Sequence, residues 1–343
     1  MRLAAQLLVT ACALAAAPPA AVRFPENPLI TQRMSATLGD DINGPSLIRV
    51  PAWIGHPLGR YYLYFAHHKG RFIRMAYADD LAGPWKIYEP GVLNVTATAF
   101  YRPQPDPPGG LFYTHVASPE VAVDDANKRL VMLVHGWFTD GKRWPEDPKE
   151  AARWAQENAY GQYTQTVVSA DGLNFAARPG ITVRTSYSRL FRWRDTWYSM
   201  GRLGVLGRAS DLLARFEEGP NPFDGGTWAG RVRHVAPIVR GDTLYVFFSG
   251  IGDAPERILL STIKLTTDWS TWRATPPVEV LRPLAAYECT DIPIKPSKVG
   301  EAEGPEHALR DPGVIEEKGR VILFYSYCGE QGIAAADVTS FVK

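Results

Sequence analysis

The chain has 343 residues, of which 45% are hydrophobic, 11% are aromatic and 21% are charged. This composition supplies a large hydrophobic core and excludes an intrinsically disordered protein. The formal net charge is +1, so the protein has no overall field that would hold a nucleic acid or an anionic membrane. We therefore expect one large domain or two ordinary ones, with no nucleic-acid partner.

The first predicted element is an N-terminal leader. Residues 1–22 contain Arg2, an apolar run and then small residues, which is typical of a secretory signal peptide rather than a spanning helix. We expect export to the periplasm or the extracellular space of a bacterium, with the working domain at 23–343. Residues 9–12 (VTAC) also resemble a lipoprotein processing site, and that alternative would leave Cys12 lipidated. No later segment is long and apolar enough to span a bilayer.

After the leader, one pattern recurs five times. A short opening motif precedes a turn and a strongly apolar strand, and a third strand follows. Four motifs align on Pro45, Pro119, Pro237 and Pro312, and the fifth has Tyr187 in place of proline. Successive anchors are roughly 50–75 residues apart, which suits one four-stranded blade with variable loops. The sequence therefore predicts an all-β fold, a five-bladed β-propeller, with a pair of β-sandwiches as the alternative. The expected second strands are Tyr61–Ala66, Arg129–His135, Thr196–Met200, Thr243–Ser249 and Val321–Tyr327.

Two features fall outside the repeated pattern. Pro148–Tyr160 has good helix formers behind an initial proline and interrupts the second repeat, so we expect a helix there. After export, Cys289 and Cys328 remain. In an oxidising compartment they could form a disulfide, and the alternative is two buried free thiols.

Polar residues are expected to gather at one end of the propeller. In an antiparallel blade, the innermost strand begins on the face of the disc where the second strand ends. Strands need apolar side chains, so polar residues at these positions are better explained by a polar ligand than by folding. The candidates for ligand contacts are Asn43, His67, His68, His135, Tyr187, Arg233, His234, Arg310 and Glu330. Their spacing is not diagnostic of a metal site, and we expect no metal or cofactor.

Two opening motifs, Arg310-Asp311-Pro312 and 118–121 (SPEV), resemble those of the five-bladed propeller glycosidases. These form the superfamily of glycoside hydrolase families 43, 32, 68 and 117, and the resemblance spans nearly all of the chain after the leader. It implies an enzyme that hydrolyses a glycosidic bond in an oligo- or polysaccharide. Two departures from family 43 are visible. Asn43-Gly44-Pro45 stands where Asp-Pro usually opens blade one, and 303–305 (EGP) imitates the proton-donor motif from an apparent loop, which we interpret as chance.

Glycosidic cleavage needs one group that protonates the departing oxygen and a second that activates water or attacks the anomeric carbon. Asp311 is the first catalytic candidate, as base or transition-state stabiliser, kept ionised by the adjacent Arg310. The alternative is a structural carboxylate paired with Arg310.

Glu120 and Glu256 are the candidates for the acid. The alternative for Glu120 is a contact with a substrate hydroxyl, and the alternative for Glu256 is an ion pair with Arg257. His234 is a further candidate, because the resemblance includes family 117 enzymes that use a His in place of a carboxylate.

Aromatic residues near the expected mouth could stack on sugar faces: Trp137, Trp144, Tyr187 and Trp228. Two other functions stay open at this point. One is a carbohydrate-binding propeller without catalysis, and the other is a glycoside phosphorylase whose Arg and His residues hold phosphate. The sequence does not indicate the sugar or the oligomeric state.

Overall fold

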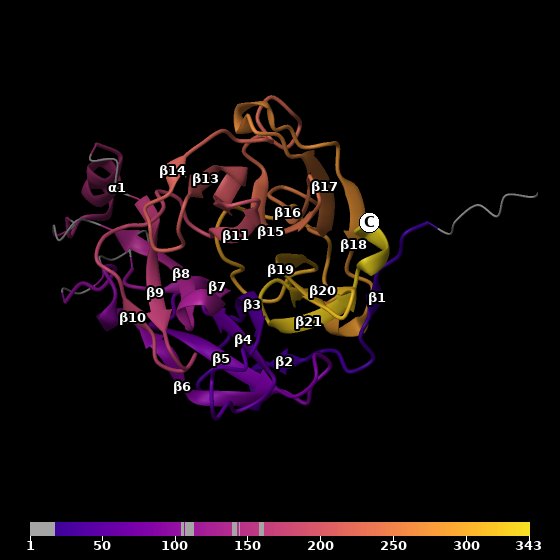
Figure 1. Cartoon of the computed structure of the whole chain (residues 1–343), viewed down its shortest axis with the longest axis horizontal. Coiled ribbons are helices and arrows are strands. Elements are labelled where there is room, and N and C mark those ends of the chain that lie inside the picture. The colour runs from indigo at the N-terminus through magenta and orange to yellow at the C-terminus, as the bar shows by residue number, and fades with distance from the viewer. Residues whose placement is uncertain (1–17, 104–105, 107–112, 139–142, 144, 158–160) are drawn as a thin grey trace, which may run out of the picture.

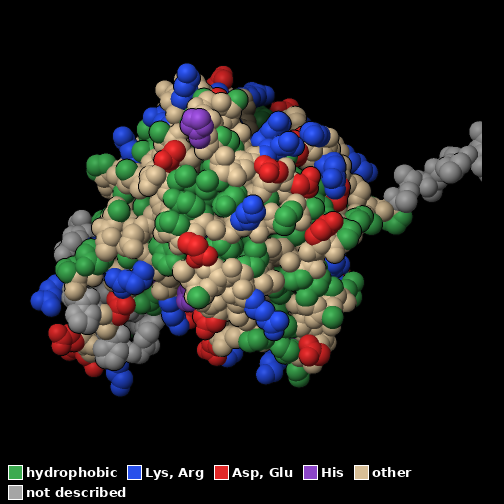
Figure 2. All heavy atoms as spheres, turned by 90° about the horizontal axis from the view of Figure 1, so that it is seen from below, with side chains coloured by type: hydrophobic (Ala, Val, Ile, Leu, Met, Phe, Trp, Pro, Cys, Tyr) green, Lys and Arg blue, Asp and Glu red, His purple; other side chains and the backbone are tan. Residues whose placement is uncertain are grey.

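Five antiparallel sheets radiate around one axis in the computed structural model of the chain (Figure 1). The structure describes residues 18–103, 106, 113–138, 143, 145–157 and 161–343. The predicted all-β, five-bladed propeller is confirmed. Basic, acidic and apolar side chains are interspersed on the face seen in Figure 2, in keeping with the small net charge.

The strands follow the chain blade by blade. Blade one contains β3 (Asn43–Arg49), β4 (Tyr61–Ala66), β5 (Phe72–Ala78) and β6 (Lys86–Asn94). Blade two contains β7 (Ala117–Asp124), β8 (Arg129–Phe138), β9 (Gly161–Ser169) and β10 (Ala176–Ala177). Blade three contains β11 (Arg189–Trp193), β12 (Thr196–Met200), β13 (Leu206–Ala209) and β14 (Glu217–Glu218). Blade four contains β15 (Val232–Arg240), β16 (Thr243–Gly250), β17 (Ile258–Lys264) and β18 (Val278–Leu281). Blade five contains β19 (Leu309–Glu317), β20 (Arg320–Tyr327) and β21 (Gly332–Asp337), joined by β1 (Val22–Arg23) and β2 (Ile30–Thr31).

Both ends of the chain build the fifth blade. β1 pairs antiparallel with β21, so that Val22 lies opposite Asp337, and β2 pairs with the same strand. Asn27 strengthens this closure because its side chain donates to the carbonyl of Ala335 at 2.8 Å and accepts from the amide of Ala335 at 2.9 Å. The ring is therefore closed by an N-terminal segment that begins where the predicted leader ends. Residues 1–17, with Cys12, lie outside the described residues.

The second strands form much of the core. All six residues of β4 are buried, because both faces of the strand pack against neighbouring blades. A strand buried on both faces is expected to read as a continuous apolar run rather than an alternating one. This explains why the second strands gave the clearest signal in the sequence.

The innermost strands share an irregularity near their first residues. The pairing register shifts after Asn43 in β3, after Ala117 in β7, after Val232 in β15 and after Arg310 in β19. Such a bulge inserts an extra residue, bends the strand and re-aims side chains. Gly44, Ser118 and Asp311 at these bulges have a positive φ, and so does Tyr187, which precedes β11, a strand that pairs with β12 without a register shift. A positive φ is unfavourable for a residue other than glycine, and it is commonest at functional sites.

The bulges correct the alignment of two repeats. The bulge of β15 holds Arg233 and His234, so His234 is the structural counterpart of Pro45. The sequence alignment that placed Pro237 there is wrong. Tyr187, with φ of 56°, corresponds to Gly44 rather than to the proline that follows it. The physical reason is that a bulge shifts the register without changing the apolar pattern that guided the alignment.

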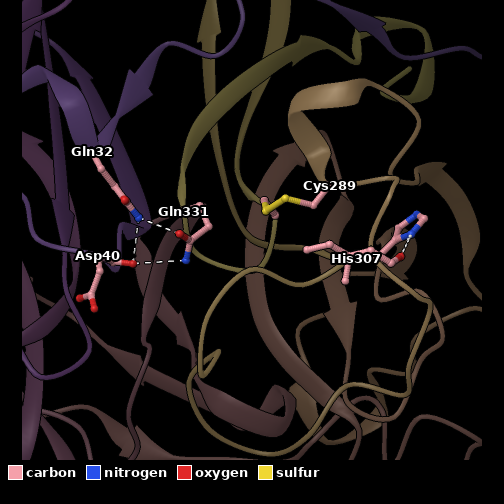
Figure 3. The surroundings of a disulfide bond; sticks show 7 residues. Gln32, Asp40, Cys289, His307 and Gln331 are labelled. Atoms are coloured by element: carbon pink, nitrogen blue, oxygen red, sulfur yellow. Dashed lines mark hydrogen bonds between the residues drawn. A yellow bond between two sulfur atoms is a disulfide. The ribbon is translucent and has the colours of Figure 1, made fainter.

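A helix and a disulfide complete the fold. The helix α1 (Pro148–Glu157) lies between β8 and β9, as predicted, and residues 158–160 of the expected span are outside the described residues. Cys289 and Cys328 form a disulfide that ties the connection before β19 to the end of β20 (Figure 3). Of the two alternatives for these cysteines, the structure therefore has the disulfide. Among the described residues, no helix is long and apolar enough to cross a membrane.

Short 3₁₀ helices lie in the connections and, in the case of η7, after the last strand. They are η1 (Gln32–Met34), η2 (Val95–Ala97), η3 (Asp125–Asn127), η4 (Arg202–Gly204), η5 (Trp269–Thr271), η6 (Ala286–Glu288) and η7 (Thr339–Phe341). Close to the disulfide, Gln32 and Gln331 are hydrogen-bonded to each other at 2.7 Å and both donate to the carbonyl of Asp40 (Figure 3). These bonds fix the turn after β20 against the segment that leads into β3.

Candidate active site

A cavity of about 440 Å³ lies where the innermost strands begin and the second strands end. Its lining includes His68, which follows β4, and Arg202, which follows β12. Tyr187 precedes β11, while Arg233 and His234 stand near the beginning of β15. The structure therefore brings the predicted His68, Tyr187, Arg233 and His234 together with Arg202, as the polarity of an antiparallel blade requires. A concave site of this size with a few convergent polar groups is typical of small-molecule binding.

His234, which lines this cavity, forms a buried pair with Asp311, which is not itself a lining residue. Two bulges on different blades position them, and His234 Nδ1 is in direct contact with Asp311 Oδ1. Burial raises the pKa of Asp311, but the adjacent His234 outweighs that effect and the net pKa is lowered. Burial lowers the pKa of His234, and Asp311 offsets this only in part. The pair is thus an ionised carboxylate that holds a neutral imidazole through Nδ1.

The other ring nitrogen of His234 has no partner. Nε2 is buried and makes no hydrogen bond within the described part of the chain, although the ring lines the cavity. A buried polar atom in a native protein is nearly always satisfied by protein, water or ligand. We therefore interpret Nε2 as the atom that meets a bound water or substrate.

His68 is held in the opposite protonation state to His234. Its Nδ1 lies 2.9 Å from Glu330 Oε2 and 3.4 Å from Asp41 Oδ2, and its Nε2 lies 3.0 Å from the Tyr187 hydroxyl. Burial alone would lower the pKa of His68, but Glu330, Tyr187 and Asp41 raise it well above the ordinary value. Asn43 also lies against this group, with its amide nitrogen 2.9 Å from Nδ1. His68 is therefore a fixed imidazolium.

The group of Asp41, His68 and Glu330 also has the composition of a metal site. Their ligand-type atoms lie within 4.8 Å of one another. However, His68 Nδ1 already pairs with both carboxylates, so these atoms satisfy one another. We interpret the group as an ion pair that fixes His68.

Glu256 lies between two arginines. Its Oε1 is 2.7 Å from Arg233 Nε and its Oε2 is 3.0 Å from Arg310 Nη2, and the side chain is fully buried. Arg310 also pairs with Glu306 and, at 3.5 Å, with Glu330. The expectation that Arg310 pairs with Asp311 is therefore not met. The contact that lowers the pKa of Asp311 comes from His234, while Arg310 joins the glutamates of blades four and five.

Glu120 lies in a separate ion pair. Its carboxylate accepts from Arg189 at 2.8 Å, from Ser46 at 3.0 Å and from the amide of Leu190 at 3.1 Å. These contacts join blades one, two and three. None of the predicted catalytic carboxylates, Asp311, Glu120 and Glu256, is among the cavity-lining residues, so the structure does not place a carboxyl pair side by side in the cavity. Their catalytic roles stay predictions.

The remaining candidates surround this centre. His135 packs against the ring of Tyr187, with centroids 4.2 Å apart, and burial lowers its pKa well below the ordinary value. His67 pairs with Asp40 at 3.2 Å on the rim. Trp137 lines the cavity, whereas Trp228 packs on Phe248. Trp144 lies outside the described residues.

The sequence reasoning did not name three polar or aromatic cavity-lining residues, Tyr113, Gln162 and Glu301, and it set Glu303 aside as a chance match. Gln162 stands near the start of a third strand, so a rule that includes third-strand beginnings would have found it. The connection before β19 carries Glu301, which pairs with Lys69, and also Glu303. The segment 303–305 lies in a loop between η6 and β19, as predicted, and its Glu303 is a cavity-lining residue.

Comparisons with known proteins agree with this fold. No family model matches the chain. It is 35% identical over 338 residues to the uncharacterized protein R118 of Acanthamoeba polyphaga mimivirus, covering 92% of this chain and 89% of that protein. A proposed glycoside hydrolase from Bacteroides ovatus superposes with a TM-score of 0.61 at 12% identity, over 95% of this chain and 97% of that one.

Two further solved structures share the fold. One is from work on GH130, a family of mannoside phosphorylases that contains glycoside hydrolases targeting β-1,2-mannosidic linkages in Candida mannan. It has a TM-score of 0.58 at 12% identity, with 94% of both chains covered. The other is a thermostable family-43 glycoside hydrolase, with a TM-score of 0.51 at 12% identity over 86% of this chain and 88% of that one. The solved neighbours are thus five-bladed propellers of the glycoside hydrolase type, as the resemblance implied.

Proposed function

We propose a function for this chain, which belongs to the protein family of R118 from Acanthamoeba polyphaga mimivirus: it hydrolyses a glycosidic bond in an oligo- or polysaccharide. The observation that carries the proposal is the contact of the cavity-lining His234 with the buried Asp311. A neutral imidazole oriented by a carboxylate is a general base suited to removing a proton from water. A propeller that only binds sugar does not need such a pair.

The proposed step uses His234 as the base. As water attacks the anomeric carbon, Nε2 takes its proton, and Asp311 stabilises the imidazolium that forms. Asp311 thus keeps the stabilising role expected from the sequence, acting through His234. We assign Glu120 and Glu256 to holding the strand ends in place, because arginines bind their carboxylates.

The lining of the cavity suits a carbohydrate. Tyr113, Trp137 and Tyr187 offer aromatic rings for the apolar faces of sugars, while Gln162 and Arg202 offer hydrogen-bond donors for hydroxyl groups. The proposal includes export. The leader at 1–22 and the disulfide support it, since structural disulfides persist mainly in oxidising compartments.

One observation favours a second candidate, a glycoside phosphorylase. The Arg202 guanidinium lines the cavity and makes no hydrogen bond or ion pair with the described residues, so it could receive a phosphate. In hydrolysis the attacking oxygen comes from water, and in phosphorolysis it comes from phosphate. An assay with and without added phosphate therefore separates the two functions.

A panel of aryl glycosides and oligosaccharides should show sugar release in phosphate-free buffer, measured as reducing ends or free phenol. His234→Gln should abolish most of this release because the base is gone. His56→Gln is the matched control, since His56 is exposed and is not a cavity-lining residue. Turnover only with added phosphate would establish the phosphorylase, and sugar binding without turnover would leave a binding propeller. Full activity in His234→Gln would exclude the pair from the reaction.

A further inference from the structure

Hydrolysis also needs a proton donor for the departing oxygen, and neither Asp311 behind His234 nor the two glutamates that line the cavity are suited to that role. Asp311 is ionised against His234, Glu301 is paired with Lys69, and Glu303 is exposed to solvent on the rim. A catalytic acid must instead carry a proton at neutral pH and reach the substrate. This question rests on the proposed function, because only bond cleavage requires such a donor.

Tyr187 meets the geometric requirement. It lines the cavity and has a positive φ of 56°, a conformation held by its surroundings. Its ring is packed between His234 and His135, with centroid distances of 4.0 and 4.2 Å. Burial raises the pKa of Tyr187, so the phenol keeps its proton. Its position beside the proposed base places both groups at the same substrate.

His68, which contacts the Tyr187 hydroxyl, can supply a proton to it. The hydroxyl lies 3.0 Å from His68 Nε2, and the other nitrogen of His68 is fixed by Glu330 and Asp41. As an imidazolium, His68 donates through Nε2 to the phenol oxygen, which leaves the phenol proton free for a second acceptor. Glu330 is in turn held by Arg310 at 3.5 Å and by the amide of Ala302 at 3.2 Å.

We propose that Tyr187 is the proton donor to the departing sugar oxygen and that His68 restores its proton. Water forms the new bond to the anomeric carbon and gives a proton to His234. The electron pair of the broken bond goes to the departing oxygen, which takes the Tyr187 proton, while His68 Nε2 passes its proton to Tyr187. Solvent then removes the proton from His234 and returns one to His68. Two histidines in opposite protonation states thus serve as base and acid reservoir.

The roles of Tyr187 and His68 in proton donation can be tested by varying the leaving group. With the sugar found in the panel, a series of glycosides from activated dinitrophenyl to unactivated alkyl leaving groups is tested on Tyr187→Phe. A good leaving group needs no proton, so kcat/KM should fall about 10²–10⁴-fold on the alkyl glycosides and far less on the dinitrophenyl glycoside. His68→Gln should show the same trend. The matched control, Tyr327→Phe, removes a hydroxyl outside the cavity and should leave the whole series unchanged.

Several outcomes would overturn the assignment. An equal loss across the series in folded Tyr187→Phe would mean that the residue only shapes the site. If the loss of kcat/KM depended on the leaving group in Glu303→Gln and not in Tyr187→Phe or His68→Gln, Glu303 would be the proton donor instead. Those results would contradict the assignment of Tyr187 but not the proposed hydrolase function. A wild-type protein that cleaves no glycoside in the series would contradict both proposals.

Discussion

Replacing Asp311 with Asn is expected to lower kcat on the best substrate by about 10²–10⁴-fold while the fold is kept. An amide has nearly the same shape as the carboxylate but carries no charge. It therefore cannot stabilise the imidazolium, and it can bind the wrong tautomer of His234. The measurement is kcat for the purified variant, with near-ultraviolet circular dichroism to verify the tertiary packing.

Asp195→Asn is the matched control for this substitution. Asp195 is fully exposed in the turn between β11 and β12, and its partner Arg192 is 3.8 Å away. This variant should keep wild-type activity. If Asp311→Asn does the same, Asp311 has no part in the reaction.

The largest loss of stability is expected from Arg310→Met. Arg310 is almost completely buried, and two of its partners, Glu256 and Glu330, are buried as well. Burial opposes the charged form, yet these glutamates raise the pKa of Arg310 above its ordinary value. Methionine fills similar volume but leaves buried carboxylates without their cation, which typically costs about 3–5 kcal/mol. Denaturant unfolding measures the change in the free energy of unfolding.

Arg320→Met provides the comparison. Arg320 pairs with Asp337 at 2.8 Å, but its side chain is 57% exposed. Surface pairs contribute about 0–1 kcal/mol, so this variant should be nearly as stable as the wild type. Similar losses in both variants would mean that the buried network contributes no more than an ordinary surface pair.

The network explains why these residues matter together. Ion pairs and hydrogen bonds run from Arg233 through Glu256, Arg310 and Glu330 to His68, and from there to Tyr187. Groups held this way need little rearrangement when charge develops during a reaction. The polar residues that the sequence marked as ligand contacts therefore include some that touch the cavity and others that fix those residues.

The fold was predictable because strand signals repeat. β4 and β12 begin and end at the predicted residues, since their apolar and β-forming side chains stand between clear turns. The bulges were not predictable. At His234 a bulge adds a residue without any change in apolar pattern, so the alignment on prolines failed in blade four. In blade three, the positive φ of Tyr187 matches the residue to Gly44 rather than to a proline.

The position of the site could be predicted from the sequence, but the pairing of its charged side chains could not. Strand polarity alone placed His68, Tyr187 and His234 at one end of the disc. Which carboxylate meets which cation depends on side chains from different blades, as in the contact of His234 with Asp311. The connection that carries Glu303 has no periodic pattern, so the sequence does not predict that Glu303 lines the cavity.

The most direct test of the central claim is a crystal structure of the Asp311→Asn protein with its oligosaccharide substrate bound. The account predicts a sugar in the cavity between His68 and His234, with a glycosidic oxygen in hydrogen-bond reach of the Tyr187 hydroxyl and the anomeric carbon facing His234. A substrate bound on another surface, or one whose glycosidic bond lies away from both residues, would contradict it.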